Sequence, residues 1–312
     1  MERFKFVLYR PLQTLPVLFG VSVITFILVR SIPGDPVRVL LGPRAKPSII
    51  AAVREQYGLD EPLLLQYVYF LYNLLQGEMG RSIIYRAPVL DVIVERLAPT
   101  LSLLAFALCL TIVLAMAMAV TAARNQRRLP DHLVRMFCTA GVGLPAFWLG
   151  IILIMVFSVG LGWFPVSGYG DSFLEHLHHL FLPALTIAVA LAPVLTRNLR
   201  ATLIEQMQAD YVQAARAKGM RESKLFWRHV LPNSLVPTVN LLGIAFSWLI
   251  GGTVVVETVF SIPGMGQLMV ASIFSRDYLL VQGITLFFAV GIICTNFLVD
   301  VVNVALDPRI DL

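Results

Sequence analysis

The sequence predicts an all-α membrane protein with six transmembrane helices, and its composition, its charge-free runs and the placement of its basic residues support this class. Of the 312 residues, 58% are hydrophobic and only 14% are charged, and the mean hydropathy is +0.79. Soluble domains carry about 25% charged residues, so this chain lacks the polar side chains to cover a soluble globule. A soluble enzyme is therefore excluded, and lipid is the expected solvent.

The predicted spans are stretches without Asp, Glu, Lys or Arg that reach the roughly 20 apolar residues a membrane crossing needs. One further stretch, Thr258–Ser275, is interrupted by Ile262-Pro263-Gly264-Met265-Gly266, and we expect a re-entrant or surface segment there. The first span is expected to stay uncleaved, because its apolar run exceeds the length typical of a signal peptide. The spans are Pro11–Val29, Leu97–Ala123, Met136–Gly170, His176–Thr196, His229–Val256 and Tyr278–Val299.

The basic residues predict the orientation of these spans. The link between spans 2 and 3 and the link between spans 4 and 5 are rich in arginine and lysine, whereas the 3–4 link carries only acidic charges and the 5–6 link only Arg276 as a basic residue. The positive-inside rule then places both termini in the cytoplasm. The net charge of +5 is thus a matter of topology, and no nucleic-acid partner is predicted. The basic residues of the two links are Arg124, Arg127, Arg128 and Arg135, and Arg197, Arg200, Arg216, Lys218, Arg221, Lys224 and Arg228.

The segment between spans 1 and 2 is expected to lie outside the membrane and to be helical. Pro47–Tyr57 and Pro62–Leu75 read as short amphipathic helices around the turn Gly58-Leu59-Asp60-Glu61. Aromatic residues of the second helix suggest that it lies on the membrane surface or against the spans. The predicted division is 1–30 for the N-terminus and first span, 31–99 for this segment, 100–304 for the core with a cytoplasmic loop at 197–232, and 305–312 for a cytoplasmic tail.

Most of the functional signal lies in the cytoplasmic loop between spans 4 and 5. Asp210 is a good N-cap, and Gln213 three residues later would complete a capping box. The small residues Ala214, Ala215 and Ala217 would let another surface approach closely, and Gly219 is expected to end the helix.

A second short helix is predicted at Arg221–Val230, ending at Pro232, with Leu225, Phe226 and Trp227 presented on a basic strip that also carries Glu222. The residues alone leave two readings open. The loop is either a docking surface for another protein or an amphipathic helix pair lying in lipid headgroups.

This loop resembles the membrane subunits of binding-protein-dependent ABC importers. Their pattern Glu-Ala-Ala-x3-Gly-x9-Ile-x-Leu-Pro is matched by Gln213-Ala214-Ala215, Gly219 and His229-Val230-Leu231-Pro232. The chain departs from the pattern at Gln213, which replaces Glu, and at His229, which replaces Ile.

Further motifs along the whole chain resemble the dipeptide/oligopeptide/nickel permease group of that family. They are Ile32-Pro33-Gly34-Asp35-Pro36, Gly58-Leu59-Asp60-Glu61-Pro62, Phe147-Trp148-Leu149-Gly150, Leu161-Gly162-Trp163-Phe164-Pro165, Gly251-Gly252-Thr253-Val254-Val255-Val256-Glu257, Arg276-Asp277-Tyr278 and Asp307-Pro308-Arg309.

The resemblance implies a type I ABC importer permease in a bacterial inner membrane. Its substrate would be a dipeptide, an oligopeptide or a nickel or other metal chelate. Its loop would couple to one or two cytoplasmic ABC ATPases through Asp210, Gln213, Ala214, Ala215, Gly219, Arg221, Glu222, Leu225, Phe226 and Trp227. A second homologous permease would complete the pathway, and an extracytoplasmic solute-binding protein would deliver the substrate.

No cofactor is expected on this chain. It has no Gly-Lys dipeptide and hence no phosphate-binding P-loop, so ATP and Mg²⁺ would bind the partner ATPases. The outer histidines His176, His178 and His179 have no acidic or cysteine residues in a metal-ligand pattern beside them, so no metal site is predicted. No catalytic constellation is recognised either, so a membrane enzyme has little support.

Candidate pathway or gating residues lie at the outer end of span 5. Glu257 ends a long apolar run, and an acidic residue there can contact a partner, the interface or the substrate. The pair Gly251-Gly252 can loosen the helix or allow close helix packing. The alternative function is an ion-coupled secondary transporter that works without an ATPase, but such proteins tend to carry ionisable residues near mid-membrane and the centres of these spans carry none.

Overall fold

A computed structural model of the chain describes residues 2–31, 37, 41–42, 45–56, 60–82 and 84–306. The motif Ile32–Pro36, the turn residues Gly58 and Leu59, and the motif Asp307–Arg309 with the tail from 307 lie outside the described residues. The helices are α1 (Glu2–Ser31), α3 (Pro47–Gln56), α4 (Leu63–Leu75), α5 (Val89–Arg124), α6 (Leu129–Gly143), α7 (Ala146–Leu153), η1 (Ile154–Gly160), α8 (Phe173–Gln208), α9 (Asp210–Ala217), α10 (Glu222–Leu225), η2 (Phe226–Val230), α11 (Leu231–Val259), α12 (Met265–Phe274) and α13 (Tyr278–Leu306).

The prediction of an all-helical membrane protein is confirmed. Among the described residues, four stretches are long and apolar enough to cross a membrane: α5, α8, α13 and the continuous helix from Glu222 to Val259. The pair formed by α6 and α7–η1 would make a fifth span, although it is bent by 108°. In α1, the described side chains include a shorter apolar stretch, Thr14–Leu28.

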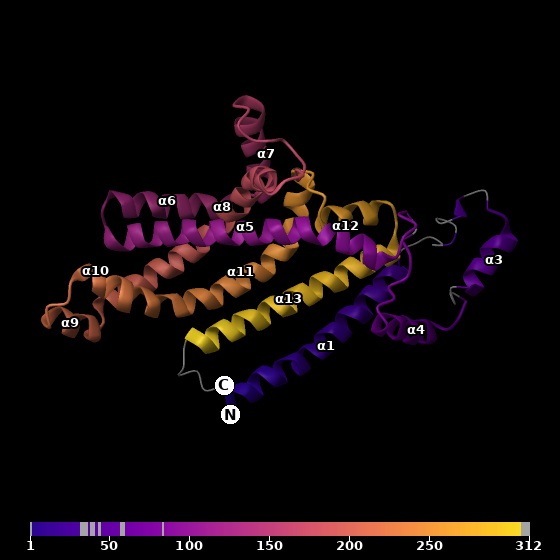
Figure 1. Cartoon of the computed structure of the whole chain (residues 1–312), viewed down its shortest axis with the longest axis horizontal. Coiled ribbons are helices and arrows are strands. Elements are labelled where there is room, and N and C mark those ends of the chain that lie inside the picture. The colour runs from indigo at the N-terminus through magenta and orange to yellow at the C-terminus, as the bar shows by residue number, and fades with distance from the viewer. Residues whose placement is uncertain are drawn as a thin grey trace.

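The bend between α6 and α7 was not expected, because the run Met136–Gly170 reads as one span. Leu144 lies in the extended region (φ −89°, ψ 124°) and is followed by Pro145. The proline ring disfavours helical geometry in the residue before it, so α6 stops and the chain changes direction. Figure 1 shows α7 projecting from the layer formed by α5, α6 and α8.

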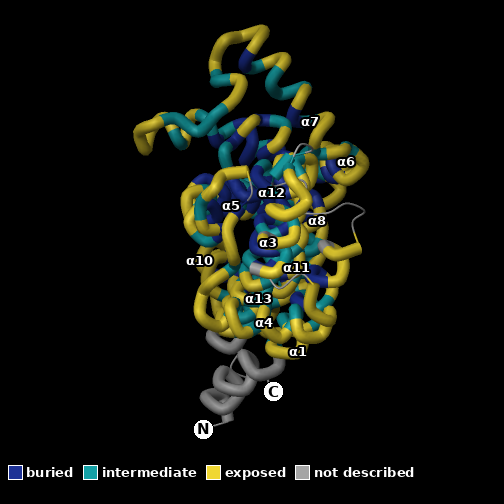
Figure 2. The backbone as a smooth tube through the Cα atoms, turned by 90° about the vertical axis from the view of Figure 1, so that its right-hand side faces the viewer, coloured by how far each residue is buried: buried dark blue, intermediate teal, exposed yellow. Residues whose placement is uncertain are grey.

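The centre of the bundle is the contact between α5 and α8. Small buried residues of α5 recur every four positions, which lets the axis of α8 come close and gives dispersion contacts along both helices. Figure 2 shows the buried backbone concentrated around α5, α8 and α12, with exposed residues outside. The small residues of this stripe are Ala107, Thr111, Ala115, Ala119 and Ala123.

The segment between α1 and α5 contains the two predicted short helices, α3 and α4. One face of α4 packs on α1: the Tyr67 ring lies 5.1 Å from that of Phe26, and its hydroxyl is 2.8 Å from Ser22 Oγ. The other face leaves Leu64, Tyr72 and other apolar residues exposed. The two ends of the molecule are therefore different, with α3, α4 and α12 at one end and α9 and α10 at the other (Figure 1).

Candidate functional site

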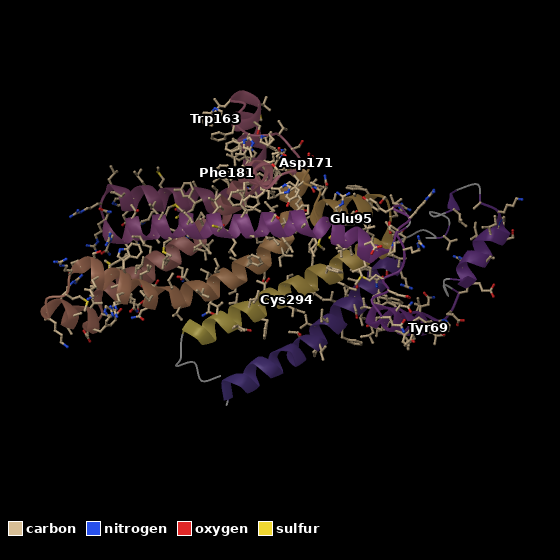
Figure 3. All side chains as sticks on the ribbon, viewed as in Figure 1. Tyr69, Glu95, Trp163, Asp171, Phe181 and Cys294 are labelled. Carbon is tan, nitrogen blue, oxygen red and sulfur yellow. The ribbon has the colours of Figure 1, made fainter. Side chains whose placement is uncertain are left out.

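The loop between α8 and α11 lies at the end of the bundle marked by α9 and α10 (Figure 1). Nitrogen-bearing side chains gather at this end in Figure 3, as the arginines and lysines of the sequence lead one to expect. The long helix α8 continues to Gln208, and a new helix starts again at Glu222. Of the predicted loop 197–232, only residues 209–221 therefore connect the long helices.

The predicted capping box at Asp210 is wrong. Helix α9 begins at Asp210 itself, its N-cap is Ala209 in an extended conformation (φ −64°, ψ 149°), and no side chain caps it. The chain turns one residue earlier than predicted, because α8 runs directly into Ala209. Asp210 then lies in the first turn, where its negative charge interacts favourably with the positive end of the helix dipole. Gln213 Nε2 instead donates to the Gln208 carbonyl at 3.2 Å.

The end of α9 at Gly219 is as predicted. Gly219 has φ +78°, a left-handed conformation that side chains with a Cβ rarely adopt. Its N–H donates to the Arg216 carbonyl at 2.9 Å, and the next N–H, of Met220, donates to the Ala215 carbonyl at 3.2 Å. These bonds close the helix end and turn the chain toward α10.

The predicted end of the second helix at Pro232 is wrong. From Glu222 the chain runs through α10 and the π-helical turn η2 into α11, with Pro232 in the first turn of α11. A proline has no N–H donor and usually interrupts a helix. Here the wider π-helical turn η2 directly precedes Pro232, and the helix continues through this point. The loop is thus rigidly joined to the spanning helix that follows it.

Two of the three predicted exposed apolar residues are buried. Leu225 and Phe226 are 1% and 5% exposed, and they pack with Val212 into a cluster with small and apolar residues of α5 and α8. The Arg124 guanidinium carbon lies 4.5 Å above the Phe226 ring, a cation–π geometry. Of the three, Trp227 alone stays exposed, at 53%. The bundle residues of the cluster are Ala119, Ala123, Leu199 and Leu203.

The outer surface of the loop consists of small residues and charged residues. Ala214, Ala217 and Gly219 are exposed, as are Arg216 and Glu222, whose side chains are joined by an ion pair of 2.6 Å. The hydrogen bonds that the Arg216 guanidinium donates to Glu222 raise the pKa of Arg216. We refer to the exposed residues Ala214, Ala217, Gly219, Arg221 and Trp227 as the loop surface. Beneath it lies the buried cluster that contains Val212, Leu225 and Phe226.

At the opposite end, Glu257 is buried, with 0% exposure. It accepts a hydrogen bond from Thr100 Oγ1 at 2.7 Å and from the backbone N–H of Gly266 at 2.7 Å and of Gln267 at 3.1 Å. Thr100 Oγ1 in turn accepts from Met265 N at 2.8 Å. Because α12 has no capping side chain of its own, Glu257 and Thr100 satisfy its free N–H groups and join α5, α11 and α12.

Space for the Glu257 carboxylate depends on glycine. A Cβ at Gly264 would lie 2.4 Å from its carboxylate, and one at Gly266 would lie 2.5 Å from the Val254 backbone. The contact between Thr100 and Glu257 was not predicted from the sequence. The available signal was a helix start after Pro263-Gly264 without a capping side chain, close to an acidic residue that lacked an assigned partner.

Gly251 and Gly252 lie on an exposed side of α11, where an added Cβ would meet no atom within 4 Å. Among the described residues, they therefore do not bring helices together. Close approach of α11 to α13 occurs instead at Gly243, where an added Cβ would lie 2.6 Å from Val299 of α13. The glycine pair shares its side of α11 with Trp248, which is 78% exposed.

The histidine cluster has a structural use. His176 Nδ1 lies 2.8 Å from the Tyr169 carbonyl oxygen, His178 Nε2 lies 2.8 Å from that of Trp163, and His179 Nδ1 lies 3.0 Å from that of Ser167. These contacts attach the segment after η1 to α8. Within the described part of the chain, no group of three or more His, Cys, Asp or Glu residues has a metal-binding arrangement.

Two buried acids outside the predicted site also position helices. Asp131, at 0% exposure, accepts two hydrogen bonds of 2.7 Å from Arg200 and so joins α6 to α8. Asp277 precedes α13 and accepts hydrogen bonds from Ser82 and from the Ile84 N–H. Both were missed, because their partners lie far away in the sequence.

Comparisons with known proteins agree along the whole chain. Residues 111–312 match the family of binding-protein-dependent transport system inner membrane components, and residues 3–105 match the N-terminal family of such membrane components. The chain is 41% identical over 305 residues to the glutathione transport system permease protein GsiC of Escherichia coli K12, and covers 98% of both chains. The GsiC protein of Shigella boydii serotype 4 is equally similar.

Two solved structures are similar in fold. One is the methionine ABC transporter MetNI in inward-facing conformations, with a TM-score of 0.55 and 17% identity over 70% of this chain and 97% of that one. The other is an amino acid ABC transporter with histidines, with a TM-score of 0.52 and 14% identity over 69% of this chain and 94% of that one. At this identity the likeness concerns the fold alone.

Proposed function

The chain belongs to the inner membrane components of binding-protein-dependent transport systems, and from this premise we propose that it forms half of the translocation pathway for a peptide-like solute of the glutathione type. The observation that carries the proposal is the 41% identity to glutathione permeases over 98% of the chain. As a multi-pass inner membrane permease of an ABC importer, it works with an ATPase, a binding protein and a partner permease, and ATP binds the ATPase.

Coupling to the ATPase occurs through the loop surface. ATP-driven closure of the ATPase dimer displaces α9, and the buried residues Leu225 and Phe226 pass this displacement to α5 and α8, against which they pack. The unbroken helix from Glu222 to Val259 carries it onward toward the other end of the molecule. Rigid elements of this kind move as bodies rather than deforming. The two subunits of the ATPase dimer can be alike or different in this scheme.

The proposed topology has six spans with both termini in the cytoplasm. The sixth span is α1, whose described apolar stretch is Thr14–Leu28 and which lies beside α13 in Figure 1. The basic residues near α9 support a cytoplasmic position for that end. The ends of α1 and α13 that carry the chain termini point toward the same side in Figure 1.

The pathway lies on the exposed side of α11, at the interface with a second, homologous permease. Gly251 and Gly252 leave this side without side chains next to Trp248, so the solute or the partner helix comes close to the backbone there. The projecting α7–η1 arm supports a partner subunit, because Trp148, Met155 and Val159 along it are exposed. Glu257 contributes to gating by holding α12 against α5 and α11.

A photo-crosslinking experiment tests the coupling surface. A crosslinking amino acid placed at Trp227 is expected to capture the ATPase in the assembled transporter. The control position is Leu75 of α4, which is 88% exposed and lies at the opposite end of the molecule (Figure 1). Capture of the ATPase from position 75 and not from position 227 would overturn the proposed orientation and coupling.

A further inference from the structure

A pocket between α6 and α8 is lined almost entirely by arginine. Its volume is about 360 Å³, and its lining residues are Arg135 and Thr139 of α6 with Arg197 and Arg200 of α8. No function assigned above uses it, because it does not belong to the loop surface or to the exposed side of α11.

The positive charge of this pocket is only partly neutralised. Arg200 is tied to the buried Asp131 through its Nε and Nη2 atoms, which fixes the guanidinium at the wall. Arg135 and Arg197 are exposed, and no ion pair involves either of them within the residues that the structure describes. Three guanidinium groups thus face one carboxylate, and the remaining positive charge favours an anionic ligand.

Phosphate is the anion that this geometry suits. Guanidinium groups present paired donors that match phosphate oxygens, and here Arg200 is already held in place. Thr139 Oγ1 donates to the Arg135 carbonyl at 2.9 Å, which leaves the hydroxyl oxygen as an acceptor toward a glycerol or similar headgroup.

The position of the pocket along the helices points to a lipid source for the phosphate. Arg135 immediately precedes the charge-free run that starts at Met136, and Arg197 immediately follows the one that ends at Thr196. The pocket therefore lies where two apolar runs begin, which is the level of headgroups. Two turns into the first run, Val142 is 50% exposed, and one turn into the second, Val194 is 36% exposed, so acyl chains would meet apolar surface.

We propose that this pocket binds the phosphate headgroup of an anionic phospholipid at the membrane interface. Basic pockets between transmembrane helices are suited to such headgroups. Under the topology proposed above, the lipid belongs to the cytoplasmic leaflet; the binding itself does not depend on the substrate or on the ATPase. Bound lipid would bridge α6 and α8 beside their ion pair.

The test measures lipid retention by the full chain, purified with phosphatidylglycerol or phosphatidylcholine and examined by native mass spectrometry. The double variant R135Q/R197Q removes two charges from the pocket and leaves the Asp131–Arg200 pair in place. The control R128Q/R228Q removes two exposed charges outside the pocket. We expect the pocket variant to hold phosphatidylglycerol roughly tenfold more weakly, and the control to behave as the unmodified chain.

Three results would overturn the proposal. The first is equal loss of phosphatidylglycerol in the pocket variant and the control, or none in either. The second is stabilisation of the lipid-free chain by inorganic phosphate that depends on Arg135 and Arg197, which would assign the site to a free anion. The third is unchanged lipid retention with loss of ATPase copurification in the pocket variant, which would make the pocket a protein contact.

Discussion

Single residues decide how the ends of the helices are built. Gly219 supplies a left-handed conformation at the end of α9, and Glu257 supplies the acceptor that α12 lacks. The first could be predicted from sequence, because a glycine after a helix acts locally. The second could not, because Thr100 and Glu257 are 157 residues apart and only the packing of α5 on α11 brings them together.

Replacing Glu257 with alanine is expected to destabilise the protein, because it leaves the N–H groups of Gly266 and Gln267 buried without an acceptor. An unsatisfied buried donor costs about 1–3 kcal/mol. Thermal unfolding of the purified chain in detergent measures the loss. The control is Glu95→Ala, since Glu95 is exposed on α5 (Figure 3); equal stability of the two variants would contradict the assigned role of Glu257.

Replacing Gly219 with valine is expected to lower solute uptake per ATP hydrolysed while membrane insertion stays intact. A β-branched side chain is strained at φ +78°, so the turn between α9 and α10 would shift and the loop surface would fit its partner less well. Gly143→Ala is the control, because its Cβ would meet no atom within 4 Å and its φ is not positive. An unchanged ratio in the Gly219 variant would show that this turn does not govern coupling.

Contacts between elements that are distant in the sequence bury residues that local patterns predict to be exposed. The spacing of residues 221–230 indicates an amphipathic helix, but it does not show that Leu225 and Phe226 meet alanines of α5 and leucines of α8. The break at Leu144-Pro145 did have a local signal, because the residue before a proline avoids helical geometry. The prediction of one span rested only on the absence of charged residues in this run, which says nothing about a bend.

Replacing Asp131 with alanine is expected to loosen α6 from α8. The change leaves Arg200 without its partner at a site where its side chain is only 21% exposed, and breaking a buried pair on one side costs about 3 kcal/mol. A double variant with Asp131→Leu and Arg200→Met should recover most of the loss, since neither charge is then left alone. Thermal unfolding of both variants is the measurement, and equal instability of the single and double variants would contradict this account.

Replacing His179 with alanine is expected to speed hydrogen exchange in the segment 161–170 several-fold, because one of its links to α8 is lost. The control is His132→Ala, an exposed histidine of α6. Exchange that is unchanged in the His179 variant would mean that this ring does not hold the segment.

At the scale of the whole molecule, the scarcity of charge predicted the main features. The 14% of charged residues lie mostly between the apolar runs, so the runs indicate the spans and the basic links indicate one side of the membrane. The helical class and the family follow from the sequence. The bend of α6 against α7, the continuous helix from Glu222 to Val259 and the arginine pocket required the structure.

Reconstituted uptake distinguishes a permease coupled to a separate ATPase from a transporter that works alone. Glutathione uptake into proteoliposomes should require this chain, its partner permease, the ATPase, ATP and the binding protein together, and should be absent with this chain alone. Sustained uptake by the chain alone, driven by an ion gradient and independent of ATP, would contradict the account.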